Sequence, residues 1–129
     1  MKALIDFAAA LSLLAALPAF ATAGEQHRLA HQPSAVVRDA DHRTDLRITV
    51  WYPAKADAPT RSIDIPPDQP LFRVGRVAPD APFADAARRP LVLLSHGFGG
   101  SARMMGWLGL ALAVKGSAVS AGRVSSENI

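Results

Sequence analysis

The chain has 129 residues, a formal net charge of +3, a sequence pI near 10.0 and no cysteine. The absence of cysteine excludes disulfides and anchoring at a lipoprotein cysteine. The basic residues do not gather in one segment with interleaved aromatic residues, which argues against a nucleic-acid-binding surface. We expect them to form a solvated, mildly basic surface.

The N-terminus has the pattern of a secretory signal peptide over residues 1–23. Lys2 precedes an apolar stretch over residues 7–17, and Ala21-Thr22-Ala23 is a small-residue cleavage site. We expect cleavage after Ala23 and export to the periplasm or the medium. No stable membrane span would remain, because the apolar run is too short to cross a bilayer. The mature chain, 24–129, is short for an α/β enzyme, which commonly needs roughly 200 residues or more.

Two strands are predicted in the first part of the mature chain. Residues 24–33 are expected to be a polar lead-in, followed by an edge strand over 34–38. Residues 46–52 alternate, with Leu46, Ile48, Val50 and Tyr52 on one face and Arg47, Thr49 and Trp51 on the other. This period of two predicts a half-exposed antiparallel strand near the edge of a sheet.

Residues 53–89 are predicted to form a long, proline-rich, irregular connection. Seven prolines lie between Pro53 and Pro82, which argues against a regular helix or a central strand. Within this segment, residues 71–74 are a candidate anchor onto the body and residues 80–87 a candidate helical turn.

The most informative segment is an apolar run over residues 91–94 that ends at His96 and a turn containing Gly97, Gly99 and Gly100. A short apolar run between proline and glycine predicts a parallel strand that is buried on both faces. A glycine-rich turn lets backbone N–H groups point at a developing negative charge, as an oxyanion hole requires.

A helix is predicted directly after this turn. Apolar residues recur at helical spacing and would form one stripe packed in the core: Met104, Trp107, Leu108, Ala111 and Leu112. Ser101 is expected to cap its start, and Gly116 to end it in a left-handed conformation.

The strand, loop and helix together resemble the third strand, oxyanion loop and first helix of the α/β-hydrolases. The His-Gly-x-Gly-Gly form is similar to the HGGG-type loops of esterases and lipases. Residues 46–54, with Trp-Tyr-Pro near their end, resemble the strand that precedes this loop in exported hydrolases of the dienelactone-hydrolase-like and platelet-activating-factor-acetylhydrolase-like group. The resemblance implies an α/β fold: the first three to four strands and the first helix of an α/β-hydrolase sheet, forming an incomplete domain.

The resemblance also implies a site in the glycine-rich loop. The backbone N–H of Phe98 would be one donor of the oxyanion hole, while Gly97 and Gly99 would set the loop geometry and His96 would organise the loop. Alternatively, the ring of Phe98 only covers the glycine turn. A phosphate site is disfavoured, because the loop lacks the Lys-Ser/Thr of a P-loop and the third glycine of a dinucleotide fingerprint.

No nucleophile is assigned, because the chain contains no Gly-x-Ser-x-Gly. The nearest match surrounds Ser120, but it follows the helix directly, where a fourth strand is expected, and no histidine follows it. His27 and His31 are expected in a flexible polar segment, and His42 in a turn, so no metal site is predicted. No cofactor is implied, since serine hydrolysis needs only water and substrate.

Two functional hypotheses follow. In the first, residues 24–129 are the N-terminal fragment of an exported serine hydrolase acting on carboxylic esters, from a truncated or frameshifted gene, and inactive without a Ser-Asp-His triad. A small-molecule ester would be the substrate of the full-length enzyme. In the second, the chain is a complete small noncatalytic exported protein that binds a ligand or partner through its glycine-rich loop. The first is favoured, because a sheet halted so early would expose apolar faces and unpaired edges.

Overall fold

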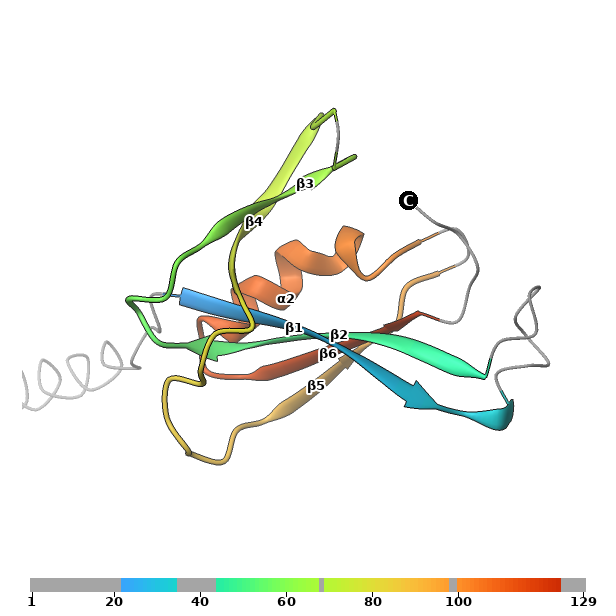
Figure 1. Ribbon diagram of the computed structural model, residues 1–129, viewed down its shortest axis with the longest axis horizontal. Coiled ribbons are helices and arrows are strands. Elements are labelled where there is room, and N and C mark those ends of the chain that lie inside the picture. The colour runs from blue at the N-terminus through green and yellow to red at the C-terminus, as the bar shows by residue number, and fades with distance from the viewer. Residues whose placement is uncertain (1–21, 35–43, 68, 98–99, 124–129) are drawn as a thin grey trace, which may run out of the picture.

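A computed structural model of the chain describes residues 22–34, 44–67, 69–97 and 100–123. Within these residues, six strands form one mixed sheet and a helix lies on one of its faces (Figure 1). The order across the sheet is β3-β4-β1-β2-β6-β5. In chain order the elements are β1 (Thr22–His31), β2 (Asp45–Ala54), β3 (Arg61–Ile65), β4 (Phe72–Pro79), β5 (Leu91–Leu94), the 3₁₀ turn η2 (Arg103–Met105), α2 (Gly106–Ala113) and β6 (Ala118–Arg123).

The strand pairings make the centre of the sheet antiparallel and its β5 end parallel. β2 pairs with β1 along the full length of both strands, from Thr22 opposite Ala54 to His31 opposite Asp45. β2 also pairs antiparallel with β6, whereas β6 and β5 run parallel. Because parallel neighbours need a crossover connection, the chain between β5 and β6 passes over one face of the sheet as η2 and α2.

β1 occupies the segment that the sequence pattern predicts as a polar lead-in, so that prediction is wrong. Only the first four residues of β1 are buried, and the rest of the strand is mostly exposed and therefore polar. Its conformation comes from backbone pairing with β2, which the side chains of β1 do not reveal. Of the edge strand predicted over 34–38, Ser34 lies in a short helical turn and 35–38 lie outside the described residues.

β2 confirms the antiparallel strand predicted over residues 46–52, but it lies inside the sheet and not near its edge. Trp51 and Tyr52, on opposite faces, both have no exposed surface. The helix covers the Trp51 face. On the other face, the Tyr52 hydroxyl donates to the Ala81 carbonyl at 2.7 Å, and its ring stacks on Phe83 with 4.2 Å between centroids.

The proline-rich segment is not the irregular connection that its composition predicts. It contains the antiparallel hairpin of β3 and β4, which rises from the sheet beside α2 (Figure 1). The prolines are compatible with these strands because Pro66, Pro67 and Pro70 fall between them and Pro79 is the last residue of β4. The end of β4 then joins the sheet next to β1, at Gly24 opposite Ala78.

Residues 80–87 form no helical turn, and this prediction is also wrong. Asp80 adopts a left-handed backbone with φ of 50°, and its N–H donates to the carbonyl of Glu25 at 2.9 Å. Phe83 then forms a bridge with Ala54. Pairing with the sheet, and not local helix formation, therefore fixes this segment.

The strand predicted over residues 91–94 is confirmed as β5, but it is not buried on both faces. β5 lies at the edge of the sheet, and Leu91 and Leu93 are 65% and 74% exposed. Val92 and Leu94, on the opposite face, pack against the core under α2. Within the part of the chain that the structure describes, only one face of β5 is therefore covered.

The predicted helix is present, but it buries a different face from the one that its apolar stripe indicates. Trp107 and Met104 are 63% and 56% exposed. The buried residues of α2 are instead three small residues and one leucine: Gly106, Gly109, Ala113 and Leu110. Glycine is needed at position 109 because a Cβ there would overlap the Trp51 indole. Within the described ranges, no helix is long and apolar enough to cross a membrane.

The predicted C-terminal end of the helical segment is confirmed, but Ser101 is not its N-cap: Ala102 is the N-cap of η2 and Met105 that of α2, and neither makes a side-chain capping bond. The Ser101 hydroxyl accepts a hydrogen bond from the N–H of Met104 at 3.4 Å, at the start of η2. Gly116 has φ of 99°, the left-handed conformation expected after a helix. Its N–H donates to the carbonyl of Ala113 at 2.9 Å, which satisfies an acceptor at the end of α2.

Gly109→Ala should lower the free energy of unfolding by about 1–3 kcal/mol, the usual cost of overpacking. This sign is opposite to the gain of about 1 kcal/mol that alanine brings at an exposed helical glycine. Gly122→Ala in β6 is the control, because a Cβ at that position meets nothing within 4 Å. Urea denaturation of the full chain measures both changes, and a stabilising Gly109→Ala would contradict the packing of Trp51 against α2.

Tyr52 should ionise at higher pH in the folded chain than in the unfolded chain. Burial raises the pKa of its phenol above the ordinary value of 10.0. The stability that the neutral phenol contributes is therefore present below pH 10.0 and lost as the pH rises through the elevated pKa. Tyr52 is the only tyrosine, so the phenolate absorbance reports on it alone. Equal titration curves with and without denaturant would show that the phenol is not buried.

Candidate functional site

The loop after β5 is the first part of the candidate site. The His96 ring is partly buried, and its Nδ1 lies 3.0 Å from the carbonyl oxygen of Gly97. Because a carbonyl oxygen can only accept, Nδ1 is the donor of this hydrogen bond. Nε2 is buried without a hydrogen-bond partner among the described residues. The ring therefore faces its own loop.

The glycines of this loop differ in how tightly they are packed. The N–H of Gly100 donates to the carbonyl of Gly97 at 3.0 Å and closes a turn. A Cβ on Gly100 would lie 3.0 Å from the Cβ of His96, whereas a Cβ on Gly97 would meet nothing within 4 Å. Phe98 and Gly99 lie outside the described residues, so the oxyanion role of the Phe98 N–H stays a prediction, as do the roles of Gly97 and His96.

Ser120 lies in the middle of β6. It is paired with Val50 on β2 and with Leu93 on β5. A nucleophile elbow needs a sharp turn between a strand and a helix, which presents the hydroxyl at the end of a sheet. The backbone at Ser120 is instead an ordinary strand within the sheet.

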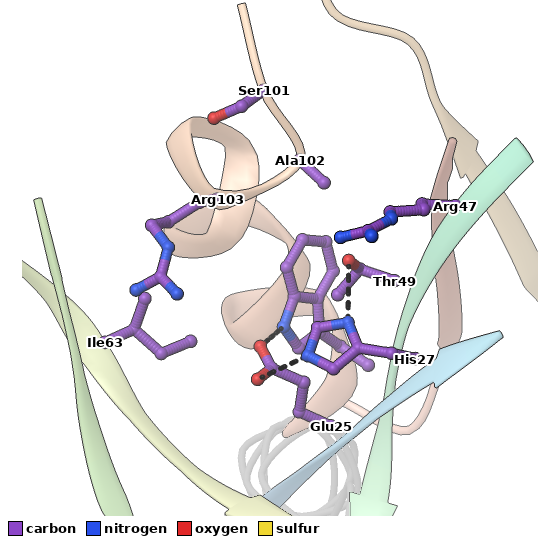
Figure 2. Close-up of a pocket in the computed structure, with 9 residues that line it drawn as sticks. Glu25, His27, Arg47, Thr49, Ile63, Ser101, Ala102 and Arg103 are labelled. Atoms are coloured by element: carbon purple, nitrogen blue, oxygen red, sulfur yellow. Dashed lines mark hydrogen bonds and ion pairs between the residues drawn. The ribbon is translucent and has the colours of Figure 1, made fainter. Parts of the chain in front are cut away.

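A cleft of about 160 Å³ opens beside the loop that follows β5, on the face of the sheet that carries α2. Figure 2 shows its walls, which come from four parts of the chain that are distant in sequence. The lining residues are Glu25 and His27 of β1, Arg47, Thr49 and Trp51 of β2, Ile63 of β3, and Ser101, Ala102 and Arg103 at the start of η2. The cleft therefore shares Ser101 with the end of the candidate oxyanion loop.

A buried carboxylate forms one side of the cleft. The Glu25 side chain is only 8% exposed, and the Trp51 indole N–H donates to its Oε2 at 2.9 Å. Its Oε1 lies 3.4 Å from both Arg61 Nη2 and His27 Nε2. A buried charge is costly unless it is paired and hydrogen-bonded, and Arg61 with the Trp51 N–H meets both needs.

His27 connects this carboxylate to a hydroxyl. Its Nδ1 lies 3.3 Å from Thr49 Oγ1, so Glu25, His27 and Thr49 follow one another across the cleft (Figure 2). Charge-assisted hydrogen bonds are shorter, about 2.7–2.9 Å, and His27 is 67% exposed to water. Thr49 also lies within β2, paired on both sides. The series therefore orients the side chains of the cleft and does not activate a nucleophile.

Two arginines border the opening from opposite sides (Figure 2). Arg103 donates to the carbonyl of Asp64 at 3.2 Å, which ties the start of η2 to β3. Arg47 is exposed and forms no hydrogen bond or ion pair with the described residues. Since Arg61 already balances Glu25, the lining carries excess positive charge and can hold an anion.

The sequence alone did not lead to this cleft. The sequence pattern predicts His27 in a flexible segment and indicates no role for Glu25, because the polar residues of β1 do not predict a strand. The signal that could have found the cleft is the period of two, which places Glu25 with His27 on one face and Arg47 with Thr49 on one face.

The remaining histidines are His31 and His42. His31 Nδ1 lies 3.1 Å from Asp45 Oδ1 at the exposed end of the β1–β2 hairpin. His42 lies outside the described residues. Among the residues that are described, no three histidine, aspartate or glutamate side chains gather as metal ligands would.

The comparisons with known proteins concern the fold. No protein-family model matches the chain, and no curated protein matches it. Among solved structures, a ferulic acid esterase from Streptomyces cinnamoneus is similar, with a TM-score of 0.62 and 22% identity over 89% of this chain. The chain spans 38% of the length of that protein. The mixed sheet with its helix is therefore an α/β fold similar to part of the fold of that protein.

Proposed function

We propose that this chain is the N-terminal part of an exported serine hydrolase that acts on carboxylic esters, and that it contributes the oxyanion loop. The observation that carries this proposal is the succession of β5, the His96 loop, α2 and β6 in a sheet similar to that of an esterase. The finer assignment is to the exported dienelactone-hydrolase-like and platelet-activating-factor-acetylhydrolase-like group. It rests on this loop and on the Trp51-Tyr52-Pro53 end of β2.

In the proposed reaction a serine attacks the ester carbonyl, a histidine accepts its proton and a carboxylate orients the histidine. The Phe98 N–H would stabilise the oxyanion that forms. Loss of one such donor typically costs about 3–4 kcal/mol of transition-state stabilisation. The serine would come from beyond this chain, because the hydroxyl of Ser120 lies in a strand. By this proposal the 129-residue chain is inactive alone.

Export rests on the predicted signal peptide, of which residues 1–21 lie outside the described residues. Thr22 and Ala23 are the first residues of β1, paired with Ala54 and Pro53. Cleavage after Ala23 would therefore remove two pairs from the β1–β2 hairpin and leave the other eight. The protein would then act in the periplasm or the medium.

The purified 129-residue chain should neither hydrolyse an ester nor react with a serine-directed probe. Methyl ferulate and p-nitrophenyl acetate are suitable substrates, and a fluorophosphonate followed by mass spectrometry reports any adduct. Ser120→Ala is the matched control for nonspecific labelling. Turnover together with an adduct on Ser120 would contradict the assignment of Ser120 to a structural position.

Sequencing of the encoding DNA from the Trp107 codon onward, with translation of all three frames, tests the other half of the proposal. We expect a strand, a Gly-x-Ser-x-Gly, an acid and a histidine. In an enzyme extended by them, Phe98→Pro removes the N–H and should lower kcat/KM by about 10²–10³-fold, whereas Phe98→Leu keeps the N–H and most activity. A reading frame with none of these features would favour a noncatalytic binding protein.

A further inference from the structure

The cleft between β1, β2 and η2 has a lining that suits a small anion, and this holds whether or not the chain belongs to an ester hydrolase. We propose that the cleft binds a small oxyanion such as a carboxylate, held by Arg47 on one side of the opening and Arg103 on the other. The ligand would lie over the His27 and Thr49 side chains, which lie near Arg47 in Figure 2.

The carboxylate of Glu25 does not block an anion from this cleft. Both of its oxygens already accept from neighbours, Oε2 from the Trp51 indole at 2.9 Å and Oε1 from Arg61 at 3.4 Å. The side chain is only 8% exposed, so its charge faces these donors more than the opening. Arg61 balances it, and the charges of Arg47 and Arg103 remain for a ligand.

Arg47 can donate hydrogen bonds to a ligand in the cleft. Its guanidinium is a planar fork of N–H donors whose geometry matches a carboxylate, and it has no partner among the described residues. Arg103 donates one N–H to the carbonyl of Asp64 at 3.2 Å, and this bond holds the side chain in place. The other N–H groups of the guanidinium can bind a ligand.

The size and charge of the cleft define the ligand further. At about 160 Å³ it is smaller than the pockets of roughly 300 Å³ and above that enclose drug-sized molecules. It therefore suits an ion of a few non-hydrogen atoms. The excess positive charge of Arg47 and Arg103 attracts a carboxylate and a phosphate alike.

Acetate tests this proposal, with acetamide as its neutral counterpart and inorganic phosphate as the doubly charged one. Each is titrated into the full chain at constant ionic strength, and the indole N–H resonances of Trp51 and Trp107 are followed by NMR. Trp51 lines the cleft and donates to Glu25, whereas Trp107 is 63% exposed on the outer face of α2. The chain has only these two tryptophans.

Acetate should shift the Trp51 resonance saturably, with a Kd on the order of millimolar, and leave Trp107 unmoved. Phosphate should also bind, and acetamide not at all. Arg47→Gln should weaken acetate binding about tenfold, because a charge-assisted bidentate contact is lost. The matched control is Arg28→Gln, which removes the same charge from β1 on the opposite face, where Arg28 donates to Gln26 at 2.6 Å.

An unchanged Trp51 resonance in ligand-free Arg47→Gln shows that the variant is folded. Acetate and acetamide with equal effects would overturn the proposal, as would the absence of saturation. Equal weakening by Arg28→Gln and Arg47→Gln would also overturn it, because the effect would then be one of overall charge.

Discussion

The hydrogen bond from the Trp51 indole to the Glu25 carboxylate is the interaction on which the helix side of this protein depends. Both residues are buried, so neither group has water as a substitute partner. Leaving such a donor or acceptor unpaired costs about 1–3 kcal/mol. The bond joins β1 to β2 and fixes the indole above the sheet. A large flat side chain held in this position then determines what can pack on it, which is the small-residue face of α2 at Gly106 and Gly109.

The position of α2 in turn places the two candidate sites. The helix continues from η2, and η2 follows directly on the loop that leaves β5. Packing of Gly109 on the indole therefore sets where this loop meets the sheet. The same carboxylate that holds Trp51 also faces His27 and forms one side of the cleft. Glu25 therefore both holds the Trp51 indole and lines the cleft.

The sequence predicts the elements whose signal is local. β2 alternates with a period of two, β5 is a short apolar run between proline and glycine, and Gly116 marks the end of the helical segment. The sequence pattern does not predict β1 or the β3–β4 hairpin. These polar and proline-rich segments form strands only because they pair with other strands of the sheet. The buried face of α2 was predicted wrongly for another reason. Residues 106–114 contain no polar side chain that would mark the solvent-facing side of the helix. The positions of the large apolar residues therefore predict the wrong buried face, and the face that packs on the sheet carries the glycines.

The candidate sites divide in the same way. The sequence predicts an oxyanion loop, because glycine spacing and a strand end are visible along the chain. This role stays a prediction, since Phe98 lies outside the described residues. The cleft was not predicted, because its walls come together only when β1 pairs with β2. The cleft depends on the hydrogen bond that the buried Trp51 indole donates to the Glu25 carboxylate.

Hydrogen exchange of the two indole N–H groups in deuterated water tests this claim most directly. Trp51 should exchange only when the chain unfolds, orders of magnitude more slowly than the exposed Trp107. Equally fast exchange of both indoles would contradict the account, because the bond that holds β1, β2 and α2 together would then be open to water.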